Sequence, residues 1–204
     1  MITIIDYKTG NIGSIQNMLK KLRVESVITS DPEIIASSTK IILPGVGAFD
    51  LGMSNLEKLN LIPVLNRKVR EDNTPVLGIC LGMQLMTRGS EEGILPGLGW
   101  IDGRVIKFRI SDTRTFKIPH MGWNFISQRK SSRLFSGMIA DPRFYFVHSY
   151  HVELESNNDM LTSTIYENEF VSSFEKDNLV GVQFHPEKSH KFGMILLKNF
   201  VELY

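Results

Sequence analysis

The sequence predicts an α/β protein with an open, mostly parallel central sheet flanked by helices and a mixed or antiparallel extension in the second half. Two observations lead there. Continuous apolar runs alternate with helix-like segments through the first half, whereas strand-like runs follow one another with few helices between them through the second. With 204 residues and no linker, repeat or low-complexity segment, the chain suits one domain spanning 1–204.

The first half contains four strand candidates with helices between them. A continuous apolar run is typical of a strand that is covered on both faces of a parallel sheet. Apolar residues at helical spacing predict a helix over 14–22, and Asp31-Pro32 supplies the cap and the proline that open a helix. We expect strands at 2–6, 25–29, 40–43 and 76–79, and helices at 14–22, from 31 onward, at 56–69 and at 81–87.

The second half changes character. Its apolar runs are short, and turn residues separate them. This pattern favours antiparallel or mixed strands that extend the sheet. We expect strands at 104–108, 124–126, 143–147, 152–154, 161–166, 170–175 and 179–183, followed by a closing helix at 192–203.

The composition argues against several classes of function. The net charge is +1 and no long basic run is present, so no nucleic-acid partner is expected. The N-terminus does not resemble a signal peptide, and no apolar stretch approaches the roughly 20 residues that span a bilayer. The single cysteine excludes an internal disulfide, and we expect a cytoplasmic protein without a membrane partner. No metal, dinucleotide or P-loop motif is present, so no cofactor is expected.

The strongest local motif surrounds the single cysteine. An apolar strand runs into Gly78-Ile79-Cys80-Leu81-Gly82 and then directly into a helix. This arrangement has the mechanics of a nucleophile elbow, in which a tight turn projects the reactive side chain at the carboxyl edge of the sheet. The helix N-terminus after Cys80 favours the thiolate. A lone cysteine is usually a small buried hydrophobe, but this frame favours a nucleophile.

A cysteine nucleophile needs a base, and the base needs an orienting group. Among five histidines, His185 stands at the end of a strand in the segment His185-Pro186-Glu187. Glu187 could accept a hydrogen bond from the far ring nitrogen. A satisfied strand-end histidine is the alternative interpretation.

A glycine-rich loop follows the third strand candidate, at Gly45-Val46-Gly47. Glycine allows backbone N–H groups to approach a ligand closely, so this loop and the N–H of Leu81 could form an oxyanion hole. Taken alone, the loop would be read as an ordinary tight turn.

Two further segments are rich in polar and aromatic side chains. Residues 145–151 place several hydrogen-bonding side chains together, and residues 117–124 mix methionine and tryptophan with histidine and asparagine. Exposed Trp and Met are enriched at interface centres, which favours a partner surface for the second segment. An ordinary loop with Trp123 in the core is the alternative.

Together these segments resemble the class I (triad) glutamine amidotransferases, and more closely the glutaminase subunits of imidazole glycerol phosphate synthases. The stretches that carry the resemblance are LPGVGAF, GICLGMQL, SEEG, PHMGWN, YFVHSY and GVQFHPEKS, and they run in the family's order along essentially the whole chain. GICLGMQ with HPE is specific to the class, and PHMGWN with HPEKS narrows the resemblance to this type of subunit.

The resemblance implies a role for each matching residue. Cys80 attacks the side-chain amide of L-glutamine, and His185, oriented by Glu187, transfers the protons. The residues implied to form the oxyanion hole are Gly45, Val46, Gly47 and Leu81. Those implied to bind glutamine are Gln84, His148, Ser149 and Tyr150. Those implied to form the partner interface or the ammonia passage are His120, Met121, Trp123, Asn124 and Lys188.

The resemblance also implies a partner. The family's glutaminase forms a heterodimer with a (β/α)₈ cyclase subunit, which uses the ammonia to make imidazole glycerol phosphate and AICAR in histidine biosynthesis. A paralogous glutaminase that feeds a sugar amidation step in surface-polysaccharide biosynthesis is the alternative.

The chain departs from the family's pattern at Lys8-Thr9, at residues 86–89 and at residues 110–116. All three avoid the Cys-His-Glu group, but the last lies near the expected docking surface, so it puts the identity of the partner in doubt. Two other classes of function stay open: a free-standing hydrolase or peptidase, and a non-catalytic binding module.

Overall fold

The computed structural model describes residues 1–204 and contains a ten-stranded mixed sheet. Along the main path of this sheet the strands run in the order β2-β1-β3-β4-β12-β11-β10-β7. The first five of them pair in parallel, and the antiparallel strands begin at β11. The parallel half consists of β1 (Ile2–Ile5), β2 (Ser26–Thr29), β3 (Lys40–Leu43), β4 (Val76–Ile79) and β12 (Leu179–Val182).

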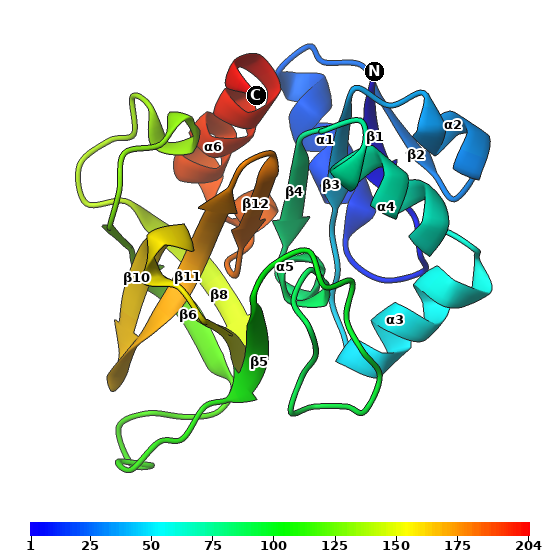
Figure 1. Ribbon diagram of the computed structural model, residues 1–204. Coiled ribbons are helices and arrows are strands. Elements are labelled where there is room, and N and C mark those ends of the chain that lie inside the picture. Colours follow the sequence, from blue (N-terminus) through cyan, green and yellow to red (C-terminus); the bar gives the residue numbers. More distant parts are fainter.

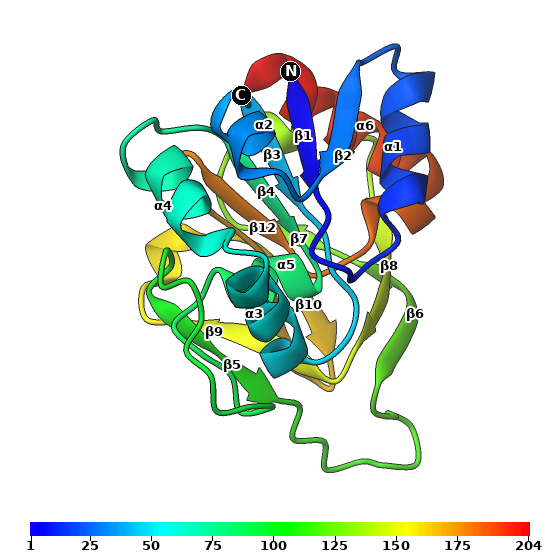
Figure 2. The ribbon, with the colours of Figure 1, turned by 90° about the vertical axis from the view of Figure 1, so that its right-hand side faces the viewer.

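Helices cover both faces of the parallel strands, as Figure 2 shows. Apolar side chains of α1 and α6 pack in one core cluster, and those of α2 to α5 pack in another on the opposite face. Both faces of the strands are therefore buried, which accounts for their continuous apolar sequences. The helices are α1 (Ile12–Lys21), α2 (Pro32–Ala36), α3 (Phe49–Lys58), α4 (Ile62–Arg70), α5 (Leu81–Leu85) and α6 (His190–Leu203).

The second half supplies the antiparallel extension, which lies to one side of the parallel strands in Figure 1. A separate two-stranded ribbon of β6 and β8 lies beside it, joined in register from His120↔His148 to Phe125↔Arg143. The fold class predicted from the sequence is confirmed. The remaining strands are β5 (Gly103–Lys107), β6 (His120–Phe125), β7 (Ser127–Gln128), β8 (Arg143–His148), β9 (Tyr150–Leu154), β10 (Met160–Tyr166) and β11 (Asn168–Lys176).

The predicted helix over 56–69 is wrong in its boundaries. Two helices, α3 and α4, occupy this region, and the chain turns between them at Asn60, whose φ is 52°. Leu56, Leu61 and Leu65 all enter the same core cluster. Because these apolar side chains recur as they would along one helix, the pattern hid the turn.

The segment around PHMGWN is a strand, so the alternative interpretation as an ordinary loop with Trp123 in the core is wrong. Along β6 the side chains of Met121, Trp123 and Phe125 are exposed, with 61%, 42% and 56% of their surface accessible, whereas His120 is buried. Successive side chains of a strand point to opposite faces, which produces this alternation.

No helix of the chain is both long and apolar enough to cross a bilayer.

Candidate active site

Three of the motifs follow three neighbouring parallel strands. The glycine-rich loop follows β3, Cys80 follows β4, and His185 lies just beyond β12. The sheet places β4 between β3 and β12, and all three run in the same direction. The topology therefore brings these segments together at the carboxyl edge, where open α/β sheets bind ligands.

Cys80 occupies the sharp turn between β4 and α5. Its φ of 53° and ψ of −108° lie in a region that non-glycine residues rarely adopt. The turn tolerates no side chain on either side, because a Cβ on Gly82 would lie 1.7 Å from the carbonyl oxygen of Leu43 and one on Gly78 would lie 2.8 Å from the nitrogen of Met83. The predicted elbow and the need for its two glycines follow from this geometry.

His185 and Glu187 are joined by a short turn. Pro186–Lys188 forms one turn of 3₁₀ helix, which brings Glu187 Oε1 to 2.7 Å from His185 Nδ1. Both side chains are buried. Burial alone would lower the pKa of His185, but its contacts with the Cys80 thiol and the Glu187 carboxylate outweigh burial and raise it to about 10. The site therefore favours a protonated imidazole.

The resting geometry leaves Nε2 of His185 without a hydrogen-bond partner. This atom is buried. The Sγ of Cys80 instead accepts a hydrogen bond from Gln183 Nε2 at 3.6 Å. Catalytic hydrogen bonds often tighten only when substrate is bound, so an unpaired Nε2 is compatible with a base awaiting its substrate.

The expected oxyanion donors are not all free. The N–H of Leu81 donates to the carbonyl oxygen of Gly45 at 3.3 Å, because the loop after β3 lies against the start of α5. An oxyanion at this position must therefore displace the Gly45 carbonyl before it can receive the Leu81 N–H. Tyr7 holds the start of the same loop, since its buried hydroxyl donates to the carbonyl oxygen of Pro44.

A cavity of about 260 Å³ opens beside Cys80. This volume is near the lower end of the range for small-molecule sites, roughly 300–1,000 Å³. The four residues predicted to bind glutamine all line it. Its lining is Val46, Gly47, Cys80, Leu81, Gln84, Glu92, Pro119, Val147, His148, Ser149 and Tyr150.

Glu92 is a member of this lining for which the sequence motifs predicted no role, although it lies in the SEEG stretch. Its carboxylate accepts a hydrogen bond from the N–H of Phe49, the first residue of α3, at 2.8 Å. It is thus a negatively charged group placed both at a helix N-terminus and at the cavity.

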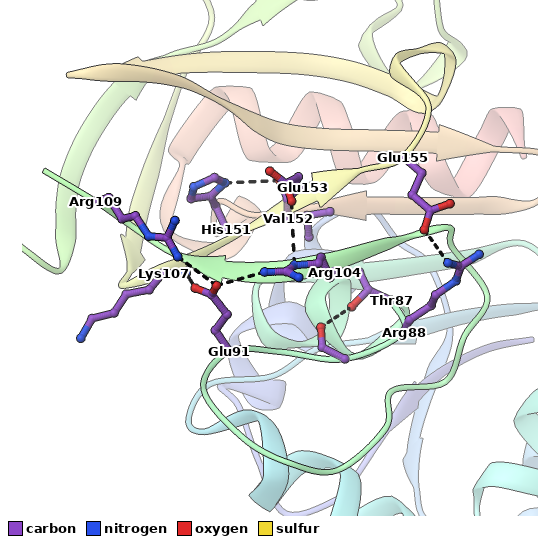
Figure 3. A network of polar contacts seen from close by, with 11 residues as sticks. Thr87, Arg88, Glu91, Arg104, Lys107, Arg109, His151, Val152, Glu153 and Glu155 are labelled. Atoms are coloured by element: carbon purple, nitrogen blue, oxygen red, sulfur yellow. Dashed lines mark hydrogen bonds and ion pairs between the residues drawn. The ribbon is translucent and has the colours of Figure 1, made fainter.

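The segment that carries Glu92 is fixed against β5 by the preceding residue (Figure 3). The Glu91 carboxylate accepts from the N–H of Lys107 at 2.8 Å and from Arg104 and Arg109 at 3.0 and 3.2 Å. The Lys107 N–H in the first place, and then the two arginines, lower the pKa of Glu91 against the opposing effect of burial. This anchoring fixes the backbone from which Glu92 reaches the cavity.

A chain of hydrogen bonds runs behind the cavity. His148 Nδ1 lies 2.7 Å from the carbonyl oxygen of Tyr150, which can only accept, so Nδ1 of His148 is the donor. His148 Nε2 therefore accepts from His120 Nδ1 at 3.0 Å, and Asn124 Nδ2 lies 3.3 Å from His120 Nε2. Burial lowers the pKa of His120 to about 4, and burial followed by the neighbouring His120 holds the pKa of His148 well below its ordinary value. Both rings are neutral near pH 7.

The residues of β6 that were expected at a partner surface lie on both faces of the strand. Met121 and Trp123 are exposed, and the exposed Lys188 places its Nζ 5.4 Å from the centre of the Tyr145 ring. His120 disagrees with the expectation, because it is buried and stacked on Tyr166 and on Phe146, with ring centres 4.1 and 4.8 Å away. Strand alternation turns it inward, so its side chain cannot contact a partner in this geometry. No cluster of three or more His, Cys, Asp or Glu side chains is placed to hold a metal ion.

Comparisons with known proteins identify the family to which the chain belongs. The family model for class-I glutamine amidotransferases matches residues 3–203. A solved glutamine amidotransferase superposes with a TM-score of 0.74 at 15% identity, over 99% of this chain and 97% of its own, and shows the same fold. The chain belongs to the class-I glutamine amidotransferases.

Relatives over the full length narrow the family further. The chain is 56% identical to imidazole glycerol phosphate synthase subunit HisH 2 of Methanococcus maripaludis, over 99% of both chains. It is 49% identical to subunit HisH 2 of Pseudomonas aeruginosa, over all of both chains. It is 46% identical to subunit HisH 1 of Methanococcus maripaludis, again over all of both. Within its class the chain is therefore a HisH-type glutaminase.

Proposed function

We propose that residues 1–204 form one glutaminase domain in which Cys80, His185 and Glu187 are the catalytic triad. The observation that carries the proposal is the convergence of these residues at the carboxyl edge of β4 and β12, beside a cavity of about 260 Å³. The raised pKa of His185 supports an imidazolium beside Cys80.

The chemistry follows from this pair. The Cys80 thiolate attacks the carbon of the glutamine side-chain amide and forms a tetrahedral oxyanion. His185 gives its proton to the departing nitrogen, the carbon–nitrogen bond breaks, and ammonia leaves behind a γ-glutamyl thioester. The neutral His185 then takes a proton from water as the water attacks the thioester, and glutamate and the thiolate are released. The backbone N–H groups of Gly47 and Leu81 are candidates to stabilise the oxyanion once the Gly45 carbonyl has moved.

The cavity has polar groups for the other end of glutamine. The Glu92 carboxylate suits the α-ammonium group, and Ser149 and Tyr150 can hydrogen-bond the α-carboxylate. The NH₂ group of Gln84 donates to the carbonyl oxygen of Tyr150 and to Gln183 Oε1, so the Gln84 side-chain oxygen is the atom that can accept from a substrate donor.

The exposed face around Met121, Trp123 and Lys188 is the proposed docking surface for a cyclase subunit. Exposed aromatic and methionine side chains are enriched at the centres of interfaces. Docking there would cover the residues next to the cavity and receive the ammonia away from bulk water. On this basis the chain supplies ammonia for imidazole glycerol phosphate and AICAR in histidine biosynthesis.

One observation favours a second acceptor. In Methanococcus maripaludis, which has two copies of the subunit, identity to this chain is 56% for copy 2 and 46% for copy 1. A second copy is free to serve another pathway, and amidation of a sugar for surface polysaccharide is the candidate.

The test is glutamate release from glutamine by the chain purified with its synthase partner, with and without the imidazole-precursor nucleotide. Release that rises with this nucleotide supports the histidine pathway. Release that is indifferent to it supports the glutaminase but points to the sugar acceptor. An assembled complex that releases no glutamate under either condition would overturn the proposal.

A further inference from the structure

Gln183 is the polar residue closest to the nucleophile that neither the triad nor the cavity lining accounts for. It lies between the end of β12 and His185, and its side chain is completely buried. Its backbone N–H continues the sheet by donating to the carbonyl oxygen of Ser172 at 2.9 Å. Val182 and Phe184, on either side, pack in the core cluster of α1 and α6, so alternation directs Gln183 toward α5.

The orientation of the Gln183 amide is fixed by its neighbours. The carbonyl oxygen of Tyr150 accepts from Gln84 Nε2 at 3.2 Å, which identifies this atom of Gln84 as the NH₂ group. The same NH₂ group donates to Gln183 Oε1 at 3.0 Å. The remaining end of the Gln183 amide is therefore its NH₂ group, and this is the group that lies 3.6 Å from Cys80 Sγ.

The Gln183 amide supplies a buried hydrogen bond to Sγ in the resting geometry, in addition to the contact between the Cys80 thiol and His185 that raises the pKa of the imidazole. A donor to a charged acceptor favours its charged form, and a thiolate is the stronger acceptor. The bond also restricts where Sγ can lie, which matters for a nucleophile that must meet a carbon at close range.

We propose that Gln183 is a positioning residue of the glutaminase site, holding Cys80 Sγ and favouring its thiolate through an amide whose orientation Gln84 sets. The proposal rests on Cys80 being the nucleophile. It also links the cavity to the sulfur, because Gln84 lines the cavity and touches Gln183 at its other end.

The test uses alkylation by iodoacetamide, followed by mass spectrometry on the peptide that contains Cys80, the only cysteine of the chain. Gln183→Met keeps the length of the side chain and removes the donor. Gln183→Glu keeps the shape and the acceptor for Gln84 but removes the donor when ionised. In the full chain with its partner, we expect both variants to move the alkylation profile to higher pH and to slow alkylation at pH 7 about tenfold. The kcat for glutamate release should fall by a similar factor.

Asn199→Leu is the matched control, because it also removes a buried amide that makes two hydrogen bonds. Asn199 lies on α6 and donates to the carbonyl oxygens of Leu134 and Ser136. The substitution should lower the melting temperature and leave the alkylation profile unchanged. A folded Gln183→Met with the wild-type profile would overturn the positioning role. If Cys80→Ala abolishes glutamate release in that case, the triad stands and the inference alone fails. If Cys80→Ala releases glutamate normally, the triad itself fails.

Discussion

Glu187 governs the charge of His185 from the far side of the imidazole. It lies 2.7 Å from Nδ1, where a carboxylate stabilises the imidazolium. The Cys80 thiol and the Glu187 carboxylate together raise the pKa of His185, so the stabilisation that they give the fold is complete below the ordinary value of 6.5 and is lost as the pH rises through about 10. At neutral pH His185 is therefore protonated.

We expect Glu187→Gln to lower the kcat of glutamate release by about 10² to 10⁴-fold, because the imidazolium loses its counter-charge while the side chain keeps its shape. The pH dependence of kcat should shift toward acid, where the weaker base still carries a proton. Steady-state kinetics across pH on the assembled complex would check both. A profile and a rate like those of the wild type would contradict an orienting role for Glu187.

The buried pair of His120 and His148 predicts an acid-sensitive fold. Burial lowers the pKa of His120 from 6.5 to about 4, so the unfolded chain binds its proton first as the pH falls. The contribution of neutral His120 to the free energy of unfolding is therefore complete above pH 6.5 and declines as the pH falls toward 4. Linkage gives a loss from His120 of about 2 kcal/mol between pH 7.5 and 5.

Urea unfolding of the wild type and of His120→Gln at these two pH values measures that loss, together with the part of the His148 titration that depends on His120. The variant should be less stable at pH 7.5 but should lose about 2 kcal/mol less on acidification. Parallel losses in the two proteins would show that His120 is not the group that titrates.

At the scale of residues, the sequence could predict the members of the site that belong to local motifs. Cys80, His185 and Glu187 sit in segments whose spacing alone indicates a nucleophile, a base and an orienting group. Glu92 and the orientation of Gln183 could not be found in this way. Their positions depend on contacts with Phe49 and Gln84, which are distant in sequence.

At the scale of elements, the elbow between β4 and α5 is the least tolerant turn of the chain. A Cβ on Gly82 would lie 1.7 Å from backbone oxygen, which cannot rotate away as a side chain could. We expect Gly82→Ala to lower the free energy of unfolding by about 3 kcal/mol.

Gly13→Ala in α1 is its control, since a Cβ there would meet nothing within 4 Å and alanine is the better helix former. Chemical denaturation of both variants checks the contrast. Equal stability of the two would mean that the close packing of α5 on β3 is not required.

The strands of the parallel half lie within a residue or so of their predicted boundaries, because short continuous apolar runs are typical of strands buried on both faces. The β6 strand instead begins at His120, four residues before its predicted start at 124. Its outward-facing side chains are apolar, which is the reverse of the usual pattern for a strand with one face in solvent. The alternation that marks such a strand was therefore hidden in the sequence.

At the scale of the whole molecule, the parallel order β3-β4-β12 is what assembles the site from distant parts of the sequence. The alternation of strands and helices predicted a parallel sheet but not which strand would lie beside β4. That neighbour, β12, comes from the other end of the chain, and its pairing with β4 brings His185 to Cys80. The sequence paired these two segments only through the chemical need of a cysteine nucleophile for a base and through the family resemblance.

The exposed face of β6 predicts where the partner binds. Trp123 stacks on His190 with ring centres 5.5 Å apart, so it is held in place before any partner arrives. We expect Trp123→Ala to weaken binding of the synthase partner by about 2 kcal/mol or more without changing the melting temperature by more than a few degrees.

Leu203→Ala is the control, because Leu203 is similarly exposed but lies at the far end of α6 from His190. Calorimetric titration of each variant with the partner would separate them. Equal affinities would place the docking surface elsewhere.

Glutamate release by Cys80→Ala, in a complex shown to be assembled, tests the central claim most directly. Removing Sγ removes the only thiol of the chain, and assembly of the complex verifies that the variant is folded. The account predicts no glutamate above the background of uncatalysed hydrolysis, alongside release by the wild type prepared in the same way. Turnover by Cys80→Ala at a rate near that of the wild type would show that the thioester route through Cys80 is wrong.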